Sequence, residues 1–282
     1  MPLKDRSSFL TMPINKEGIT MLERVLYLNE VLLEEMPEYR EQASKFASDY
    51  SEQRRLLRSL MNVRPPRPIT DEFIEVQDAL LTQELAEKEL INISKLRPTT
   101  IDRHIYLWKG DITTLEVDAI VNAANSAMLG CFIPCHKCID NAIHSASGVQ
   151  LREKCNEIMV KQGREEPTGQ AKITSGYNLP SKYVIHTVGP IISGELTAKD
   201  CELLKSCYKE CLELAIQNNL SSIAFCCIST GEFHFPNDIA AQIAVETVSD
   251  ILQKNRSEIE VIFNVFKQED YQIYRKLLGE DS

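Results

Sequence analysis

The sequence contains no run of about 20 apolar residues, which is the length that a membrane-spanning helix needs. Its first residues, MPLKDRSSFL, lack the basic-then-apolar pattern of an export signal. Basic residues are not in excess either, since 31 Lys and Arg stand against 41 Asp and Glu, for a net charge of −10. We therefore expect no export, no membrane anchoring, and neither nucleic acid nor an anionic membrane as main partner. An anionic small ligand remains open, because backbone amides at helix N-termini bind phosphate without basic side chains.

The nine cysteines do not form the even-numbered set of a disulfide-rich secreted domain. Cys201, Cys207 and Cys211 fall within a helical pattern, and Cys226 and Cys227 within an apolar, strand-like run. Reduced thiols fit a reducing compartment, so we expect a cytoplasmic protein. A chain of 282 residues with 43% hydrophobic residues can build a full core, in one large domain or two modest ones.

Residues 1–99 are expected to form an all-helical extension that is distinct from the rest of the chain. Apolar residues recur at helical spacing, and Thr70 is suited to cap the last of the helices. Consecutive prolines at 65 and 66 exclude helix between the second and third patterns. We interpret this extension as a packing unit without chemistry of its own. The helical patterns cover residues 22–36, 39–61 and 70–85.

Residues 100–282 show a different pattern, in which short apolar runs alternate with helical segments. This alternation predicts a three-layer α/β domain, and continuous apolar runs such as IAFCCI predict strands buried on both faces. Ligands of such domains bind at the carboxyl ends of the strands. The expected strands lie at 104–108, 119–122, 172–174, 183–188, 222–228 and 260–266, and the expected helices at 140–161, 198–218, 237–254 and 268–278.

Residues 121–148 concentrate the reactive side chains, and within them Cys131, His136 and Cys138 form a C-x4-H-x-C cluster. Two thiolates and one imidazole suit a borderline-soft divalent ion, most often zinc, so we expect one zinc ion per chain. Three protein ligands leave one coordination position for water or substrate. Cys135 is a possible replacement or fourth ligand. The alternative is a run of reduced, partly buried thiols without a metal.

Five motifs in order carry a resemblance to a known family: KGDIT, VDAIVNAANSAMLG, CIDNAIHSASG, TGQAKITSGYNLPSKYVIHTVGP and ISTGEFHFP. From Ile101 onwards the chain resembles a macrodomain, the ADP-ribose-binding fold, which implies a central mixed sheet. Where hydrolytic macrodomains of the MacroD type have a run of glycines, this chain has CFIPCHKC. That segment resembles the zinc-containing macrodomains of bacteria and fungi, which also carry a helical N-terminal extension.

The resemblance implies an ADP-ribose site built from residues that follow the expected strands. The Asp111 carboxylate and the Ile112 amide would bind adenine through hydrogen bonds. The alternative is that the Gly-Asp pair after the strand is an ordinary turn. The loop at 229–233 would hold the diphosphate on its amides, although its glycine also suits any strand-to-helix turn. Phe233 and Phe235 are candidates for a ribose wall or for the core. The implied ligand-binding residues are Asp111, Ile112, Asn125, Ile139, Asp140, Ser229, Thr230, Gly231, Glu232 and Phe233.

Asn125 and Asp140 are the catalytic candidates that the resemblance implies. Asn125 would hold the distal ribose, and Asp140 would activate or orient water. Asp140 is alternatively a helix N-cap, and His144, on the same helical face, is a supporting or a packing residue. We expect Asn122 to hold its loop through bonds to the backbone, and His186 to be a satisfied core histidine.

The resulting hypothesis is a zinc-dependent hydrolase that releases mono-ADP-ribose from protein side chains, as esters of Asp or Glu. Zinc would polarise a substrate oxygen or lower the pKa of bound water, but the bond that breaks stays open. The alternatives are a reader that binds ADP-ribose without cleavage and an esterase for O-acyl-ADP-ribose. By resemblance, zinc macrodomains of bacterial pathogens accompany a sirtuin-type transferase and a lipoyl-carrier protein, which makes that carrier a possible substrate. The helical extension would then have an alternative to its packing role, which is to recognise the carrier or to cover the ADP-ribose cleft.

Overall fold

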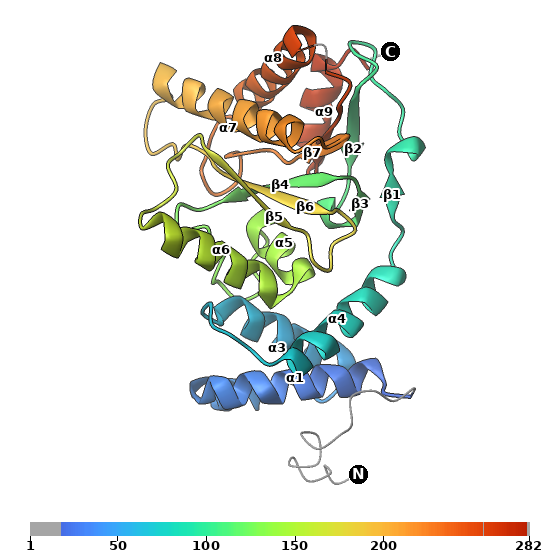
Figure 1. Ribbon diagram of the computed structural model, residues 1–282, viewed down its shortest axis with the longest axis vertical. Coiled ribbons are helices and arrows are strands. Elements are labelled where there is room, and N and C mark those ends of the chain that lie inside the picture. The colour runs from blue at the N-terminus through green and yellow to red at the C-terminus, as the bar shows by residue number, and fades with distance from the viewer. Residues whose placement is uncertain (1–17, 256, 281–282) are drawn as a thin grey trace.

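The computed structural model describes residues 18–255 and 257–280, and it begins with a helical unit (Figure 1). Thr20 caps the first helix in a capping box with Glu23, and Thr70 caps α4 as predicted. The expected single helix over 39–61 is wrong, because the chain leaves the helix after α2 and restarts at Asp49, whose side chain caps α3. The elements are α1 (Met21–Glu35), η2 (Pro37–Tyr39), α2 (Arg40–Ala43), α3 (Tyr50–Val63) and α4 (Asp71–Ala86).

The rest of the described chain forms a six-stranded sheet with the order β2-β8-β7-β4-β6-β5. All neighbouring strands are parallel except β5, which pairs antiparallel to β6, so the predicted mixed sheet is confirmed. β7 is shorter than expected and ends at Phe225. The strands are β2 (Ile105–Lys109), β4 (Ala119–Ala124), β5 (Ala171–Ser175), β6 (Tyr183–Val188), β7 (Ser222–Phe225) and β8 (Glu260–Val265).

Helices cover both faces of the sheet, which confirms the predicted three-layer α/β fold. One face carries α7 (Ala198–Gln217), α8 (Asn237–Asn255) and α9 (Gln268–Leu277), and the other carries α5 (Ile139–Ser147) and α6 (Val149–Gln162) (Figure 1). The sheet and these helices bury one continuous apolar core.

A single helix was expected over 140–161, but Gly148 divides it into α5 and α6. Its φ of 97° lies in the left-handed region that glycine adopts without strain. A Cβ atom there would also approach the side chains of Gln77 and Gln150 to 2.5 Å, so another residue at this position would displace them. Because of this break, the axis of α6 points in a different direction from that of α5.

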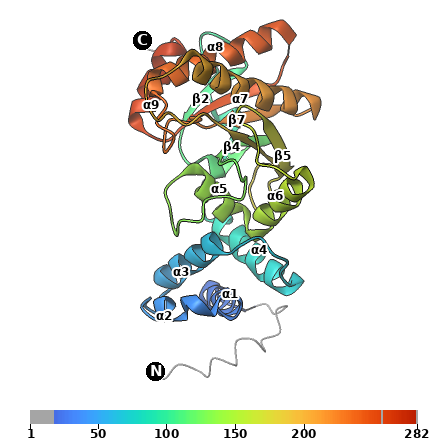
Figure 2. The ribbon, with the colours of Figure 1, turned by 90° about the vertical axis from the view of Figure 1, so that its left-hand side faces the viewer.

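The helical unit lies against α5 and α6, on the side away from α7 to α9 (Figures 1 and 2). Gln77 accepts a hydrogen bond from the Val149 amide at 3.0 Å, and Asp78 accepts one from Asn178 at 2.6 Å. The connection to the sheet passes through β1 (Ile91–Asn92), which pairs with β3 (Leu115–Glu116). The domain boundary near residue 99 stays a prediction.

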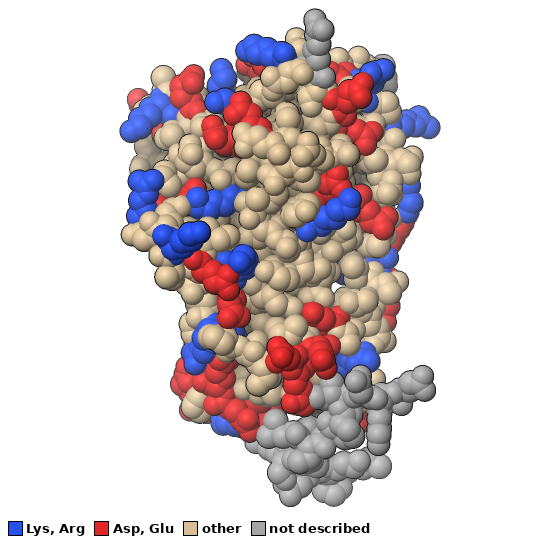
Figure 3. Space-filling view, in the orientation of Figure 1, with Lys and Arg blue, Asp and Glu red and all other residues tan. Residues whose placement is uncertain are grey.

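The molecular surface in Figure 3 carries interspersed acidic and basic side chains, with acidic groups gathered over the helical unit. On the face shown there is no continuous basic patch. Among the described residues, no helix is both long enough and apolar enough to cross a membrane.

Candidate active site

Two loops meet at the carboxyl ends of the neighbouring strands β4 and β7. The first runs from Asn125 to α5, and the second comprises residues 226–236, between β7 and α8. His136 of the first loop has its Nε2 atom 3.7 Å from the Glu232 carboxylate of the second. Since parallel strands direct their following loops to one edge of the sheet, this edge is the expected ligand site of the fold.

Cys131, His136 and Cys138 lie together in the first loop, with their donor atoms within 4.8 Å of one another. All three side chains are half-buried. Cys138 is the N-cap of α5, where its Sγ accepts the Asn141 amide at 3.4 Å, and its own amide donates to His136 Nδ1 at 3.3 Å. Two sulfur donors and one nitrogen donor at this spacing fit a borderline-soft divalent ion. Burial and the neighbouring Cys131 raise the pKa of the Cys138 thiol to about 12.

Cys135 lies outside this group, although it belongs to the same loop. Its Sγ atom lies 3.3 Å from Ser59 Oγ and 3.6 Å from the Arg55 carbonyl oxygen, both in α3 of the helical unit. The predicted trio of ligands is therefore brought together, while the fourth cysteine contacts the helical unit.

Asp140 is buried in the first turn of α5, two residues after the ligand candidate Cys138. Its alternative interpretation as the helix N-cap is wrong, because Cys138 occupies that position. Asn122 donates to one carboxylate oxygen of Asp140 at 2.8 Å, and Asn125 reaches the other at 3.4 Å. Burial raises the pKa of Asp140 to about 6, against the lowering effect of the Asn122 bond. Both catalytic candidates thus lie beside each other at the end of β4.

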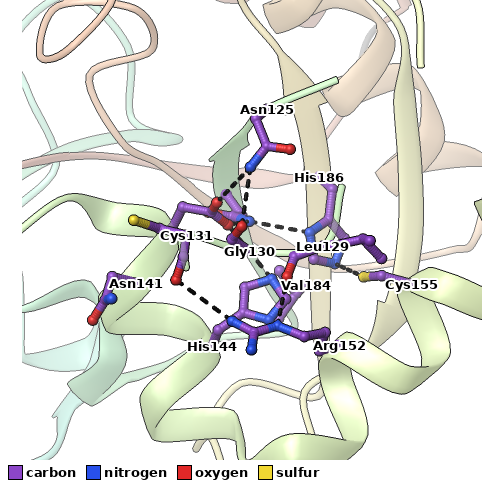
Figure 4. A network of polar contacts seen from close by, with 12 residues as sticks. Asn125, Leu129, Gly130, Cys131, Asn141, His144, Arg152, Cys155, Val184 and His186 are labelled. Atoms are coloured by element: carbon purple, nitrogen blue, oxygen red, sulfur yellow. Dashed lines mark hydrogen bonds and ion pairs between the residues drawn. The ribbon is translucent and has the colours of Figure 1, made fainter. Parts of the chain in front are cut away.

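Asp140 belongs to a buried polar cluster with Asn122, and the cluster includes His144 and His186, whose positions Figure 4 shows. The Asn122 side chain bonds Asp140 and His186 rather than loop backbone, so its predicted role was wrong in that respect. His186 lies 3.2 Å from Asn122 and 2.9 Å from Thr174, which confirms a satisfied core histidine, and burial lowers its pKa to about 4. His144, Cys155 and His186 also bring possible metal donors within 4.8 Å. Because both nitrogens of His186 already have partners, we interpret this group as part of the core.

His144 is buried, and neither ring nitrogen has a hydrogen-bond partner within the described residues. Burial lowers its pKa well below the usual value, so the ring is neutral. The ring packs on Gly130, where a Cβ atom would approach it to 2.9 Å. This contact keeps the first loop close to α5. The Nε2 atom also lies 3.5 Å from Asp140 Oδ1, so His144 has contacts of both kinds that the sequence left open, packing and supporting.

Asp111 follows β2 and caps the short helix η4 (Ile112–Thr114). Its Oδ1 atom accepts bonds from the amide and the hydroxyl of Thr113, at 3.0 and 2.7 Å, and the residue is exposed. It borders a cavity of about 150 Å³ that is also lined by Arg54, Arg58 and Lys88 of the helical unit. The side chain of Ile112 is buried. Of these two residues, only Asp111 therefore offers its side chain to a ligand.

Phe266 is a residue of this edge that the sequence analysis did not single out. Its side chain is 78% exposed, which is unusual for an aromatic residue directly after a buried strand. The preceding Val265 carbonyl accepts the Gly110 amide at 3.0 Å, so Phe266 lies close to Asp111. Its position at the carboxyl end of an apolar strand was the signal that could have identified it.

The second loop has a backbone that is held in a tight turn. Ser229 and His234 both have left-handed φ angles, of 65° and 57°. The Ser229 hydroxyl is buried without a partner among the described residues, and Thr230 donates to the Cys227 carbonyl at 3.1 Å. Phe235 is 1% exposed and belongs to the core, which leaves the half-buried Phe233 as the candidate for a ribose wall.

Comparison with known proteins shows which family and which proteins this chain is similar to. Residues 121–244 match the family described as the Macro domain. The chain is 53% identical over 263 residues to a protein-ADP-ribose hydrolase of Treponema medium, covering 93% of this chain and 100% of that protein. It is 51% identical over 228 residues to a protein-ADP-ribose hydrolase of Staphylococcus aureus (strain MSSA476), covering 80% and 85%.

Two solved structures are similar to the described fold. A macrodomain of Trypanosoma brucei in complex with ADP-ribose has a TM-score of 0.62 and 31% identity, covering 78% of this chain and 95% of that one. A macrodomain of Oceanobacillus iheyensis with ADP has a TM-score of 0.57 and 40% identity, covering 62% and 90%.

Proposed function

Since the chain belongs to the macrodomain family, we propose that it is a zinc-dependent hydrolase that removes mono-ADP-ribose from modified protein side chains. The two relatives named as protein-ADP-ribose hydrolases, at 51% and 53% identity, support the removal of ADP-ribose from proteins. The observation that carries the finer proposal is the convergence of the Cys131, His136 and Cys138 donors in the loop that leads into α5, whose first turn holds Asp140 beside Asn125. The proposed substrates are esters of Asp or Glu, and the proposed product is free ADP-ribose.

One zinc ion per chain would be held by Cys131, His136 and Cys138. When bound, zinc supplies Lewis-acid polarisation of a substrate oxygen or of water. The two oxygens of Asp140 accept bonds from Asn122 and Asn125, and its Oδ1 atom also lies 3.5 Å from His144 Nε2. In that position the carboxylate orients a water molecule or accepts its proton, and Asn125 holds the distal ribose beside it.

The rest of ADP-ribose would extend along the edge of the sheet. The amides of the turn over 229–233 would bind the diphosphate, with Phe233 beside the ribose. Asp111 would accept a bond from the exocyclic amine of adenine, and the exposed ring of Phe266 offers a surface on which the base can stack. Such fixed contacts far from the reacting bond would orient the distal ribose at Asp140.

Replacing Asp111 by asparagine is expected to weaken ADP-ribose binding by about 10- to 100-fold, because a hydrogen bond to a charged group contributes roughly 1.5–3 kcal/mol. Asparagine retains an oxygen for the Thr113 amide, so η4 stays capped, but its NH2 group opposes the adenine amine. Isothermal titration with ADP-ribose measures this effect. Asp102→Asn, in the loop that precedes β2, is the matched control and should bind like the unaltered chain. An affinity within twofold for the Asp111 variant would remove Asp111 from the adenine site.

A lipoyl-carrier protein modified by a sirtuin-type transferase is a candidate partner that rests on family resemblance alone. A cytoplasmic location is likewise proposed from the reduced cysteines.

Metal content combined with turnover tests the proposed function. We expect one zinc per chain, release of ADP-ribose from Asp- or Glu-modified protein, loss of turnover on chelation, and recovery on adding zinc. Turnover that persists in the metal-free protein would contradict the metal dependence. ADP-ribose binding without turnover in either state would indicate a reader, and cleavage of O-acyl-ADP-ribose but not of modified protein would indicate a small-molecule esterase.

A further inference from the structure

Helix α3 of the helical unit contacts the metal-binding loop, residues 131–138, through one face. Arg58, Ser59 and Asn62 share that face because they are spaced by about one helical turn. Asn62 Oδ1 accepts the Cys135 amide at 2.9 Å, and Ser59 Oγ lies 3.3 Å from Cys135 Sγ. Arg58 donates to the His136 carbonyl oxygen at 3.3 Å. Two consecutive residues of the loop are thus held by a helix that lies far from them in the sequence.

These bonds act where the loop adopts a strained conformation. Cys135 has a φ of 52°, a left-handed value that costs a non-glycine residue roughly 1–3 kcal/mol. Such a conformation persists only when neighbouring groups fix it, and the bond from its amide to Asn62 does so. The residue that follows is His136, so this turn sets the direction of the imidazole toward the two cysteines.

A second path joins α3 to the same loop through Asn141 of α5. Arg58 donates to Asn141 Oδ1 at 2.8 Å, and the Asn141 amide group donates in turn to the Ile133 carbonyl at 3.0 Å. The backbone amide of Asn141 donates to Cys138 Sγ. Asn141 is completely buried, so it has no water to replace these partners. Arg58 therefore fixes the side chain that organises the middle and the end of the loop.

Arg152 of α6 contacts the beginning of the loop, as Figure 4 shows, and also the end of α3. Its guanidinium donates to the Leu129 carbonyl at 2.6 Å and the Cys131 carbonyl at 3.5 Å. The same group donates at 2.6–2.9 Å to three carbonyls at the end of α3, those of Met61, Asn62 and Arg64. It also lies 4.3 Å from the centre of the Phe132 ring. Both ends of the loop are consequently connected to α3.

We propose that α3 holds the metal-binding loop in the conformation that brings its three metal-binding side chains together. Arg58 and Asn62 are the positioning residues for His136. The helical unit is then more than the packing appendage that the sequence suggested. A loop of this length loses conformational entropy when its three ligands converge, and a loop that is already ordered loses less on binding the metal. This inference rests on the metal site of the proposed function but not on catalysis.

The test compares zinc affinity in Arg58→Ala, Asn62→Ala and the matched control Arg54→Ala, each as the full chain under reducing conditions. Arg54 lies one turn before Arg58 on α3 and pairs with Glu84 of α4 at 2.6 Å, so its loss disturbs the helical unit without touching the loop. Competition with a chromophoric chelator measures the dissociation constant. We expect Arg58→Ala and Asn62→Ala to bind zinc about 10- to 100-fold more weakly, as is usual when residues that orient metal ligands are removed.

A second measurement on the metal-free proteins keeps the result independent of metal binding. Hydrogen exchange at the Cys135 amide should be at least about tenfold faster in Arg58→Ala and Asn62→Ala than in the unaltered chain. The reason is that protection of this amide from exchange depends on the hydrogen bonds between α3 and the loop. Arg54→Ala should match the unaltered chain in both measurements. Equal zinc affinity and exchange in all four proteins would overturn the proposal, as would an equal loss in Arg54→Ala. An unaltered chain that binds zinc without turnover would instead contradict the proposed function while leaving this inference intact.

Discussion

Replacing Cys138 by serine is expected to abolish turnover of ADP-ribosylated protein while ADP-ribose binding is preserved. Serine is a favoured N-cap, so its hydroxyl can accept the Asn141 amide as the thiol does and α5 should remain intact. It cannot replace a thiolate as a ligand for a borderline-soft ion. Loss of Lewis-acid stabilisation of several kcal/mol corresponds to a fall in the turnover number of about a thousandfold or more.

Cys135→Ser is the matched control for this substitution. It changes the same residue type in the same loop, but its sulfur faces Ser59 and Arg55 rather than the trio. We expect this variant to retain zinc and turnover. Single-turnover assays, zinc analysis and titration with ADP-ribose should be performed on both proteins. Full turnover in Cys138→Ser, or equal losses in the two variants, would contradict the proposed set of metal ligands.

Replacing Asp140 by asparagine is expected to reduce the turnover number by about 10²- to 10⁴-fold, the usual contribution of a positioned acid or base. Asparagine has the same shape and keeps an oxygen for the bond from Asn122, but it cannot accept a proton from water. Zinc content should stay at one per chain, because Asp140 is not among the three donors. This combination separates the expected defect from that of Cys138→Ser.

Asp118→Asn provides the control for loss of a half-buried carboxylate away from the site. Asp118 accepts bonds from Lys182 at 2.7 Å and from the Ser221 amide at 2.6 Å, at the opposite ends of the strands. We expect this variant to lose some thermal stability and to keep its turnover number. If Asp140→Asn turned over as fast as Asp118→Asn, the carboxylate at 140 would serve only to hold the neighbouring asparagines.

The sequence predicted the layers of the fold because local patterns determine them. Apolar runs buried on both faces marked the strands of the sheet, and Thr70 marked the start of α4. The break at Gly148 was missed because the helical pattern continues on either side of it. The left-handed φ of Gly148 and the approach of Gln77 from a distant helix, neither of which is visible in the sequence, show why glycine is needed there.

The candidate site was predictable only as far as its residues are neighbours in the sequence. Cys131, His136 and Cys138 lie within eight positions, so their spacing indicated the cluster. Arg58, Asn62 and Arg152 were not predicted, because isolated polar residues on amphipathic helices are usually solvated. Their partners in the loop become apparent only when the helical unit lies against α5.

The strand order has a consequence for how the chain acquires its structure during synthesis. β2 is made early, yet its hydrogen-bonded neighbour is β8, the last strand of the sheet. The helical unit and the metal-binding loop therefore leave the ribosome well before the sheet can close. Nascent chains have local helix contacts available first, while pairing over such long separations is slow. A chain that ends prematurely before β8 would leave β2 and β7 with unpaired edges, which are typical starting points of aggregation.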